Sequence, residues 1–199
     1  LQEIVFDIES ISLGDFDYIG EFTAKKNRNR NHDLFKSTGC FFRPNYERGI
    51  LIYALITKFK IESFLEIGFG RGYSSMCAAL AFKEAGIDGK VVTIDPGIDE
   101  QHLKNLSNVF PKEWFDLITF IKQTSQVALP QVKETFDLVL IDGDHTLDAV
   151  SSDWAGTKDK YNKFLIFDDY HLPTKKDPGG GIQCAKLIDT IDDDSKELI

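Results

Sequence analysis

The chain has 199 residues, of which 42% are hydrophobic and 28% charged, and its formal net charge is −9. These values are typical of one folded domain and argue against a disordered chain. The negative charge opposes general electrostatic binding to nucleic acid, because phosphates repel it. The sequence shows no apolar run long enough to span a membrane and no secretory signal pattern. We therefore expect a cytoplasmic protein without a nucleic-acid or membrane partner.

The three cysteines, Cys40, Cys77 and Cys184, are widely spaced along the chain. Their odd number and the absence of a C-x-x-C pair argue against a zinc site and against a disulfide framework. This cysteine usage is typical of a reducing compartment.

The chain divides into an irregular N-terminal part and a regular remainder. We predict an irregular segment or lid over residues 1–43 and a globular domain over residues 44–199. The basic run KKNRNRNH at residues 25–32 is either a solvated loop or a mobile lid over a site on that domain.

From residue 44 onward, apolar strands alternate with helices. A helix is predicted from Pro44, which suits a first helical turn. The strands follow at 63–68, 90–95, 117–123, 136–142 and 163–169, and the further helices at 73–86, 100–110, 125–132, 147–161 and 181–191. The strand runs are apolar throughout, as expected when helices cover both faces of a sheet. The pattern predicts a doubly wound, mainly parallel α/β sheet, whose ligands bind outside the carboxyl ends of the strands.

The first strand runs into a glycine-rich loop, EIGFGRGYSS, at residues 66–75. Its glycines would let the backbone approach a ligand, and the following helix start offers N–H groups to an anion. A dinucleotide fingerprint needs its third glycine where Tyr73 stands. Glu66 would repel a pyrophosphate but suit an amino group, so we predict a zwitterionic ligand. The alternative is a tight strand–helix turn without a ligand.

This loop resembles motif I of the class I S-adenosylmethionine (SAM)-dependent methyltransferases. Its E-x-G-x-x-x-G-Y-S pattern is similar to that of the catechol and caffeoyl-CoA O-methyltransferases. The later stretches GDHT (143–146) and FDDYH (167–171) resemble the macrocin O-methyltransferase-like branch. The resemblance covers about residues 44–190 and implies a Rossmann-like fold. Because little chain follows the last predicted helix, we expect the C-terminal strand hairpin of that fold to be shortened.

The resemblance implies a role for each matching position. Glu66 and Gly68 would line the methionine part of SAM, and Ser74 would bind its carboxylate. Asp95 would accept both ribose hydroxyls, although it is alternatively a turn residue before Pro96. The full set of cofactor-binding candidates is Glu66, Gly68, Gly70, Gly72, Ser74, Asp95, Ser125, Gln126 and Asp142, of which Ser125 and Gln126 would lie at the adenine.

Three carboxylates, Asp142, Asp168 and Asp169, end two predicted neighbouring strands. Such oxygen ligands suit Mg²⁺ or another hard divalent cation, and the resemblance implies a metal at these positions. Alternatively, Asp168 or Asp169 caps the segment after its strand, and Asp142 binds SAM without a metal. His145 and His171 compete for the role of general base, with His171 preferred.

These features predict metal-assisted, SAM-dependent O-methylation of a small hydroxylated molecule, such as a sugar or secondary metabolite. One alternative is a non-catalytic protein of the same fold that binds a partner. The other is an NAD-type oxidoreductase, which the misplaced third glycine disfavours. Asp144 is a further candidate for the carboxylate cluster of Asp142, Asp168 and Asp169. Asp153 is expected to be a helix and core residue. Homo-oligomerisation stays open.

Overall fold

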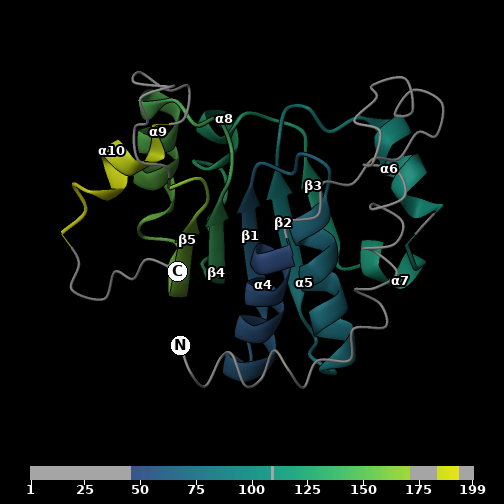
Figure 1. Ribbon diagram of the computed structural model, residues 1–199. Helices are drawn as coiled ribbons and strands as arrows, with labels where there is room; N and C mark the ends of the chain where they lie inside the picture. The colour runs from purple at the N-terminus through teal and green to yellow at the C-terminus, as the bar shows by residue number, and fades with distance from the viewer. Residues whose placement is uncertain (1–45, 109, 171–182, 193–199) are drawn as a thin grey trace.

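The computed structural model describes residues 46–108, 110–170 and 183–192 (Figure 1). The predicted N-terminal segment, the basic run at 25–32, Cys40 and His171 lie outside these residues. The strands are β1 (Ser63–Ile67), β2 (Lys90–Ile94), β3 (Ile118–Ile121), β4 (Phe136–Ile141) and β5 (Tyr161–Phe167). The helices are α4 (Tyr46–Phe59), α5 (Tyr73–Glu84), α6 (Glu100–Ser107), α7 (Lys112–Phe115), α8 (Ser125–Ala128), α9 (Leu147–Thr157) and α10 (Cys184–Ile188).

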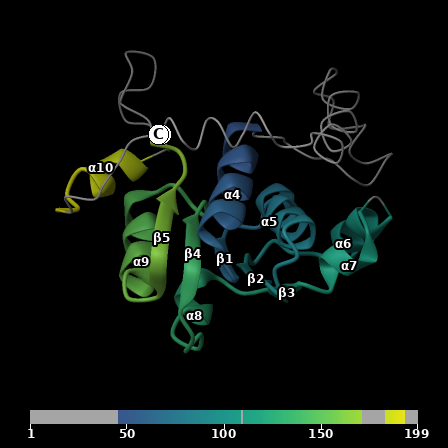
Figure 2. The same cartoon turned by 90° about the horizontal axis from the view of Figure 1, so that it is seen from below.

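All strand pairs are parallel, and the strand order is β3-β2-β1-β4-β5. Helices α4 and α5 lie over one face of the sheet and α8 and α9 over the other (Figure 2). The core is accordingly divided in two, because alternate strand residues point to opposite faces. Phe64 and Val91 pack with α4 and α5, while Leu65 and Val92 pack with α8, α9 and α10. The prediction of a doubly wound parallel sheet is confirmed.

The element boundaries differ from the prediction mainly around β5 and α7. β5 begins at Tyr161 rather than at residue 163, because Tyr161 pairs with Phe136 and Lys163 binds Asp137 at 3.1 Å. The sequence predicts residue 161 at the end of the preceding helix, which in the structure ends at Thr157. The short helix α7, anchored by buried Trp114, was not predicted. Within the described residues no strand follows β5, so β5 is an edge strand there.

In the ranges that the structure covers, no helix has the length and apolarity needed to cross a bilayer. Cys77 and Cys184, the two cysteines among the described residues, are buried free thiols.

The register of the sheet brings the residues after the strands into one row. Ile67 at the end of β1 pairs with Ile94 of β2 and with Ile141 of β4. The ladder continues one residue further, since Asp142 N–H donates to Ile67 O at 2.8 Å and Asp168 N–H to Ile141 O at 3.0 Å. The strand order reverses between β1 and β4, which is where such sheets bind ligands.

Gly68 and Gly70 provide a test of this geometry. Gly68 has φ 95, and a Cβ there would lie 2.0 Å from the carbonyl oxygen of Asp142. Gly70 has φ 51, and a Cβ there would meet no atom within 4 Å. We expect Gly68→Ala to lower the free energy of unfolding by about 3 kcal/mol or more through overpacking and strain. Gly70→Ala should cost only about 1–2 kcal/mol from its backbone conformation. Urea unfolding followed by circular dichroism measures both, and equal losses would contradict the close approach of β1 and β4.

Candidate active site

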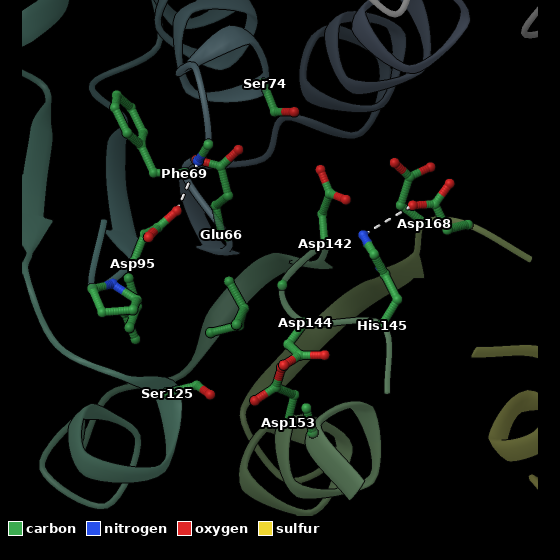
Figure 3. Close-up of a pocket in the computed structure, with 18 of the residues that line it drawn as sticks. Glu66, Phe69, Ser74, Asp95, Ser125, Asp142, Asp144, His145, Asp153 and Asp168 are labelled. Carbon is green, nitrogen blue, oxygen red and sulfur yellow. Dashed lines mark hydrogen bonds and ion pairs between the residues drawn. The ribbon is translucent and has the colours of Figure 1, made fainter. Parts of the chain in front are cut away.

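A pocket of about 630 Å³ opens at the carboxyl edge of the sheet, around the ends of β1, β2 and β4. Figure 3 shows Asp95 on one side of this pocket, Asp142, His145 and Asp168 on the other, and Glu66 between them. Gly72 is not among the lining residues. The sequence-predicted residues that line the pocket are Glu66, Gly68, Gly70, Ser74, Asp95, Ser125, Gln126, Asp142, His145, Asp168 and Asp169.

Within the glycine loop, Gly70 is the position that leaves the backbone open to the pocket. It is exposed, and its N–H donates to Oδ2 of Asp95 at 2.8 Å. Gly68 is required for packing against Asp142, and Gly72 is the N-cap of α5, where a side chain would collide with Phe69. A turn without a ligand accounts for Gly68 and Gly72 by packing and for Gly70 by its φ of 51, while Gly70 in addition leaves the backbone open to the pocket.

Glu66 lies at the floor of the pocket with only 1% of its surface exposed. Its Oε2 accepts hydrogen bonds from Ser75 Oγ at 2.5 Å and from Thr93 Oγ1 at 2.8 Å. Burial raises the pKa of Glu66 to about 7, although the two hydroxyls and the charge of Arg48 act in the opposite direction. This carboxyl can therefore change its charge near neutral pH.

Asp95 follows β2, and its carboxylate is already held by the backbone. Oδ1 accepts from Gly97 N–H at 2.6 Å, while Oδ2 accepts from the glycine loop at Gly70. The turn around Pro96 is thus real, and the same carboxylate also lines the pocket. Each carboxylate oxygen has a second lone pair, so Asp95 can still accept hydrogen bonds from a ligand.

The lower side of the pocket in Figure 3 carries Ser125, Asp144 and Asp153. Ser125 begins α8 and is buried, and the neighbouring Gln126 is exposed. Asp153 is 2% exposed, and burial raises its pKa while the Ser125 hydroxyl opposes this. Asp153 lies in α9 as expected, but it also lines the pocket. Asp144 accepts a hydrogen bond from Thr146 N–H at 2.9 Å, which organises the turn before α9.

Asp142, Asp168 and Asp169, which follow β4 and β5, form an acidic rim of the pocket. This rim contains a positive side chain that was not predicted from the sequence. Nη1 of Arg48, in the first turn of α4, donates to Oδ2 of Asp142 and to Oδ2 of Asp168. The side chains are 16%, 18% and 26% exposed in the order Arg48, Asp142, Asp168. The charge that the structure places between these two carboxylates is therefore a guanidinium.

The charges of this rim perturb one another. Burial raises the pKa of Asp142, Arg48 opposes the shift, and the neighbouring Asp168 carboxylate adds to it. Burial alone would lower the pKa of Arg48, but Asp142 and Asp168 raise it above its ordinary value. Arg48 therefore stays charged and partly neutralises the two acids.

The third rim carboxylate, Asp169, pairs with a different group. Its Oδ2 lies 3.2 Å from Nε2 of His145. Asp169 has φ 58, which is uncommon for a residue other than glycine. One ligand atom each of Asp142, His145 and Asp169 lies within 4.8 Å of the others. This set overlaps with the predicted metal ligands but contains His145 in place of Asp168.

Arg48 could have been found from the order of the elements. α4 is followed directly by β1, so the two run in opposite directions and the first turn of α4 lies at the carboxyl end of β1. A cation in that turn is then placed over the strand ends. Ser75 and Thr93 were also missed, because their hydroxyls bind the buried carboxyl of Glu66 and carry no motif of their own.

Comparison with known proteins identifies the family of the chain. A family model described as a methyltransferase domain matches residues 65–170, which is more than half of the chain. No curated protein matches the sequence.

Solved structures share the fold at low identity. A putative O-methyltransferase from Klebsiella pneumoniae has 17% identity and a TM-score of 0.62, over 94% of this chain and 84% of that one. The SAH-bound methyltransferase PaMTH1 from Podospora anserina has 18% identity and a TM-score of 0.57, over 76% of this chain and only 62% of that one. The O-methyltransferase TomG from Streptomyces achromogenes, solved with SAM, has 18% identity and a TM-score of 0.53, over 74% and 70%. The chain therefore belongs to the methyltransferase-domain family and has the Rossmann-like fold of a class I methyltransferase.

Proposed function

We propose that this chain is a SAM-dependent O-methyltransferase acting on a small hydroxylated molecule. The observation that carries the proposal is the division of one pocket into two halves. The Asp95–Gly70 pair lies on one side and the His145–Asp169 pair on the other. The first suits a ribose and the second suits proton removal from a hydroxyl. The names of TomG and PaMTH1, solved with SAM and SAH, support the choice of cofactor.

The cofactor half would hold SAM in an extended pose along the strand ends. Asp95 would accept the two ribose hydroxyls, and Ser125 with Gln126 would contact the adenine. The N-terminus of α5, next to Ser74, would bind the carboxylate of the methionine part. Glu66 would face the amino group, and the exposed backbone at Gly70 would lie against the cofactor.

The acceptor half supplies a base. When Asp169 accepts a hydrogen bond from Nε2 of a neutral His145, the lone pair of the imidazole is on Nδ1. In the proposed transfer, the acceptor oxygen would form a bond to the methyl carbon while the carbon–sulfur bond breaks and its electrons return to sulfur. Nδ1 of His145 would take the hydroxyl proton. His171, the other candidate base, lies outside the described residues.

A divalent cation remains part of the proposal, because one ligand atom each of Asp142, His145 and Asp169 lies within 4.8 Å of the others, so the three could hold one. Two carboxylates and one imidazole suit Mn²⁺ better than Mg²⁺, because imidazole is a ligand of transition metals whereas Mg²⁺ takes oxygen ligands. When bound, such a cation would lower the pKa of the acceptor hydroxyl and orient it. His145 would then act as a ligand instead of a base.

The two alternatives from the sequence have weaker support. An NAD-type oxidoreductase would place a pyrophosphate beside Glu66 and the acidic rim, which is repulsive wherever those groups are ionised. A non-catalytic protein of the same fold would have no use for the paired His145 and Asp169.

The cofactor assignment is tested by isothermal titration with SAM, with and without Mg²⁺, and with NAD⁺ as the competing ligand. We expect SAM to bind and NAD⁺ not to bind. Asp95→Ala should weaken SAM binding by about tenfold or more, because two charge-assisted hydrogen bonds are lost. Asp116→Ala, at an exposed acid outside the pocket, is the matched control. A folded protein that binds no SAM would overturn the proposal.

Glu66 gives SAM binding a defined pH dependence. Its pKa of about 7 in the free protein means that the carboxyl is largely protonated near pH 6. A cationic amino group beside it would favour the ionised form, so binding should release nearly one proton near pH 6 and much less near pH 7.5. SAM affinity should rise with pH across this range. Titration in buffers of different ionisation enthalpy measures the release, and Glu66→Gln should abolish it.

The same carboxyl sets the sign of a stability effect. Because its folded pKa lies above the ordinary value of 4.5, the folded state binds more protons, and stability falls as pH rises from about 4.5 to 7. Asp142 also has a raised pKa, so the contribution of Glu66 is the difference in free energy of unfolding between wild type and Glu66→Gln, measured across this pH range. In the SAM titrations described above, identical proton release by wild type and Glu66→Gln would show that Glu66 does not face the amino group of SAM.

The base is tested by methyl transfer from labelled SAM to a panel of hydroxylated sugars and catechols. His145→Gln should lower the rate by about 10²–10⁴-fold while leaving SAM affinity within about twofold. Asp169→Asn should cause a smaller loss, because it removes only the orienting charge. Full activity of His145→Gln would exclude His145 as base or ligand. A wild-type protein that binds SAM and methylates no member of the panel would support the binding-protein alternative.

A further inference from the structure

Arg48 occupies a position that the sequence had suggested for a metal ion. It bridges Asp142 after β4 and Asp168 after β5, two of the three carboxylates expected to hold a divalent cation. One nitrogen, Nη1, makes both contacts. The rim thus contains a cation of its own before any metal binds.

The position of Arg48 is set by tight packing of α4 on α5. Gly49, the next residue, is buried, and a Cβ there would lie 2.4 Å from the hydroxyl of Tyr73. This close approach at the first turn of α4 directs the neighbouring Arg48 over the strand ends. With 16% of its side chain exposed, the guanidinium is largely withdrawn from water and its charge is weakly screened.

Arg48 and a divalent cation would compete for the carboxylate of Asp142. Asp142 belongs to the cluster of possible metal ligands with His145 and Asp169, and it also binds Arg48. A cation drawn to that cluster meets a carboxylate whose charge is already compensated and a like charge on its other side. Metal binding therefore requires Arg48 to release Asp142 or to share it.

We propose that Arg48 is the resident cation of the rim and competes with divalent metal ions for Asp142, so that it sets the affinity of the site for metal. The functional meaning rests on the proposed methyl transfer. With Arg48 in place, His145 is available as the base. With a metal bound, His145 would be a ligand and the ion would lower the pKa of the acceptor hydroxyl.

The proposal is tested by titrating the ligand-free protein with Mn²⁺. The concentration of free Mn²⁺ is measured by electron paramagnetic resonance. Arg48→Met removes the charge and keeps much of the side-chain length. We expect this variant to bind Mn²⁺ at least about tenfold more tightly than wild type. Arg71→Met is the matched control, because Arg71 lines the same pocket from the glycine loop. It should change Mn²⁺ affinity by no more than about threefold.

A second variant separates competition from a change in folding. Arg48→Ala should bind Mn²⁺ tightly, and added methylguanidinium should displace the ion by refilling the arginine position. The same concentration of tetramethylammonium should not, since it cannot donate hydrogen bonds to the carboxylates. Arg48→Lys, which keeps the charge on a shorter side chain, should have an intermediate Mn²⁺ affinity and should stay folded.

Two results would overturn the inference. Equal Mn²⁺ affinity in wild type and the Arg48 variants would show that the guanidinium does not compete. Absence of Mn²⁺ binding in folded Arg48 variants would show that the rim is not a cation site. Titration of the same samples with SAH tests the cofactor separately, so a failure here is distinguishable from a failure of the proposed function.

Discussion

The parallel register of β1 with β4 is the constraint on which the pocket depends. It allows Asp142 to follow Ile67 in the same hydrogen-bonded ladder, and it brings the carbonyl of Asp142 so close to Gly68 that no side chain fits there. Because β5 continues the same register, Asp168 arrives beside Asp142. The site is therefore a property of strand ends, and its precision comes from backbone hydrogen bonds rather than from flexible side chains.

The pocket also depends on how its negative charges are stabilised. Several carboxylates lie in the pocket at one edge of the sheet, and they are stabilised in four different ways. Glu66 is held by two hydroxyls in a buried place, Asp95 by backbone N–H groups, and Asp142 and Asp168 by Arg48. Asp169 pairs with His145. These separate arrangements let acids with different protonation behaviour lie close together, which suits a pocket that would bind a cationic cofactor and remove a proton.

Much of this could be predicted from local sequence. Uninterrupted apolar runs indicated strands covered on both faces, and the glycine loop after the first of them marked the ligand side. The prediction was weaker where one residue has two roles. Asp153 was expected in the core because it lies within a helix, yet α9 turns it toward the pocket. Gly68 was assigned to the cofactor, while the structure explains it by its contact with Asp142.

The sequence by itself determined the fold class, the strand ends and the types of side chain that follow them. These depend on periodicity and on adjacency along the chain, which a single sequence contains. Only the tertiary structure decided which charges meet. Arg48 and Asp168 are 120 residues apart, and their contact depends on α4 running against β1 and on the close packing at Gly49. Such pairings follow from the packing of elements against one another, so local pattern could predict the carboxylates but not the guanidinium between them.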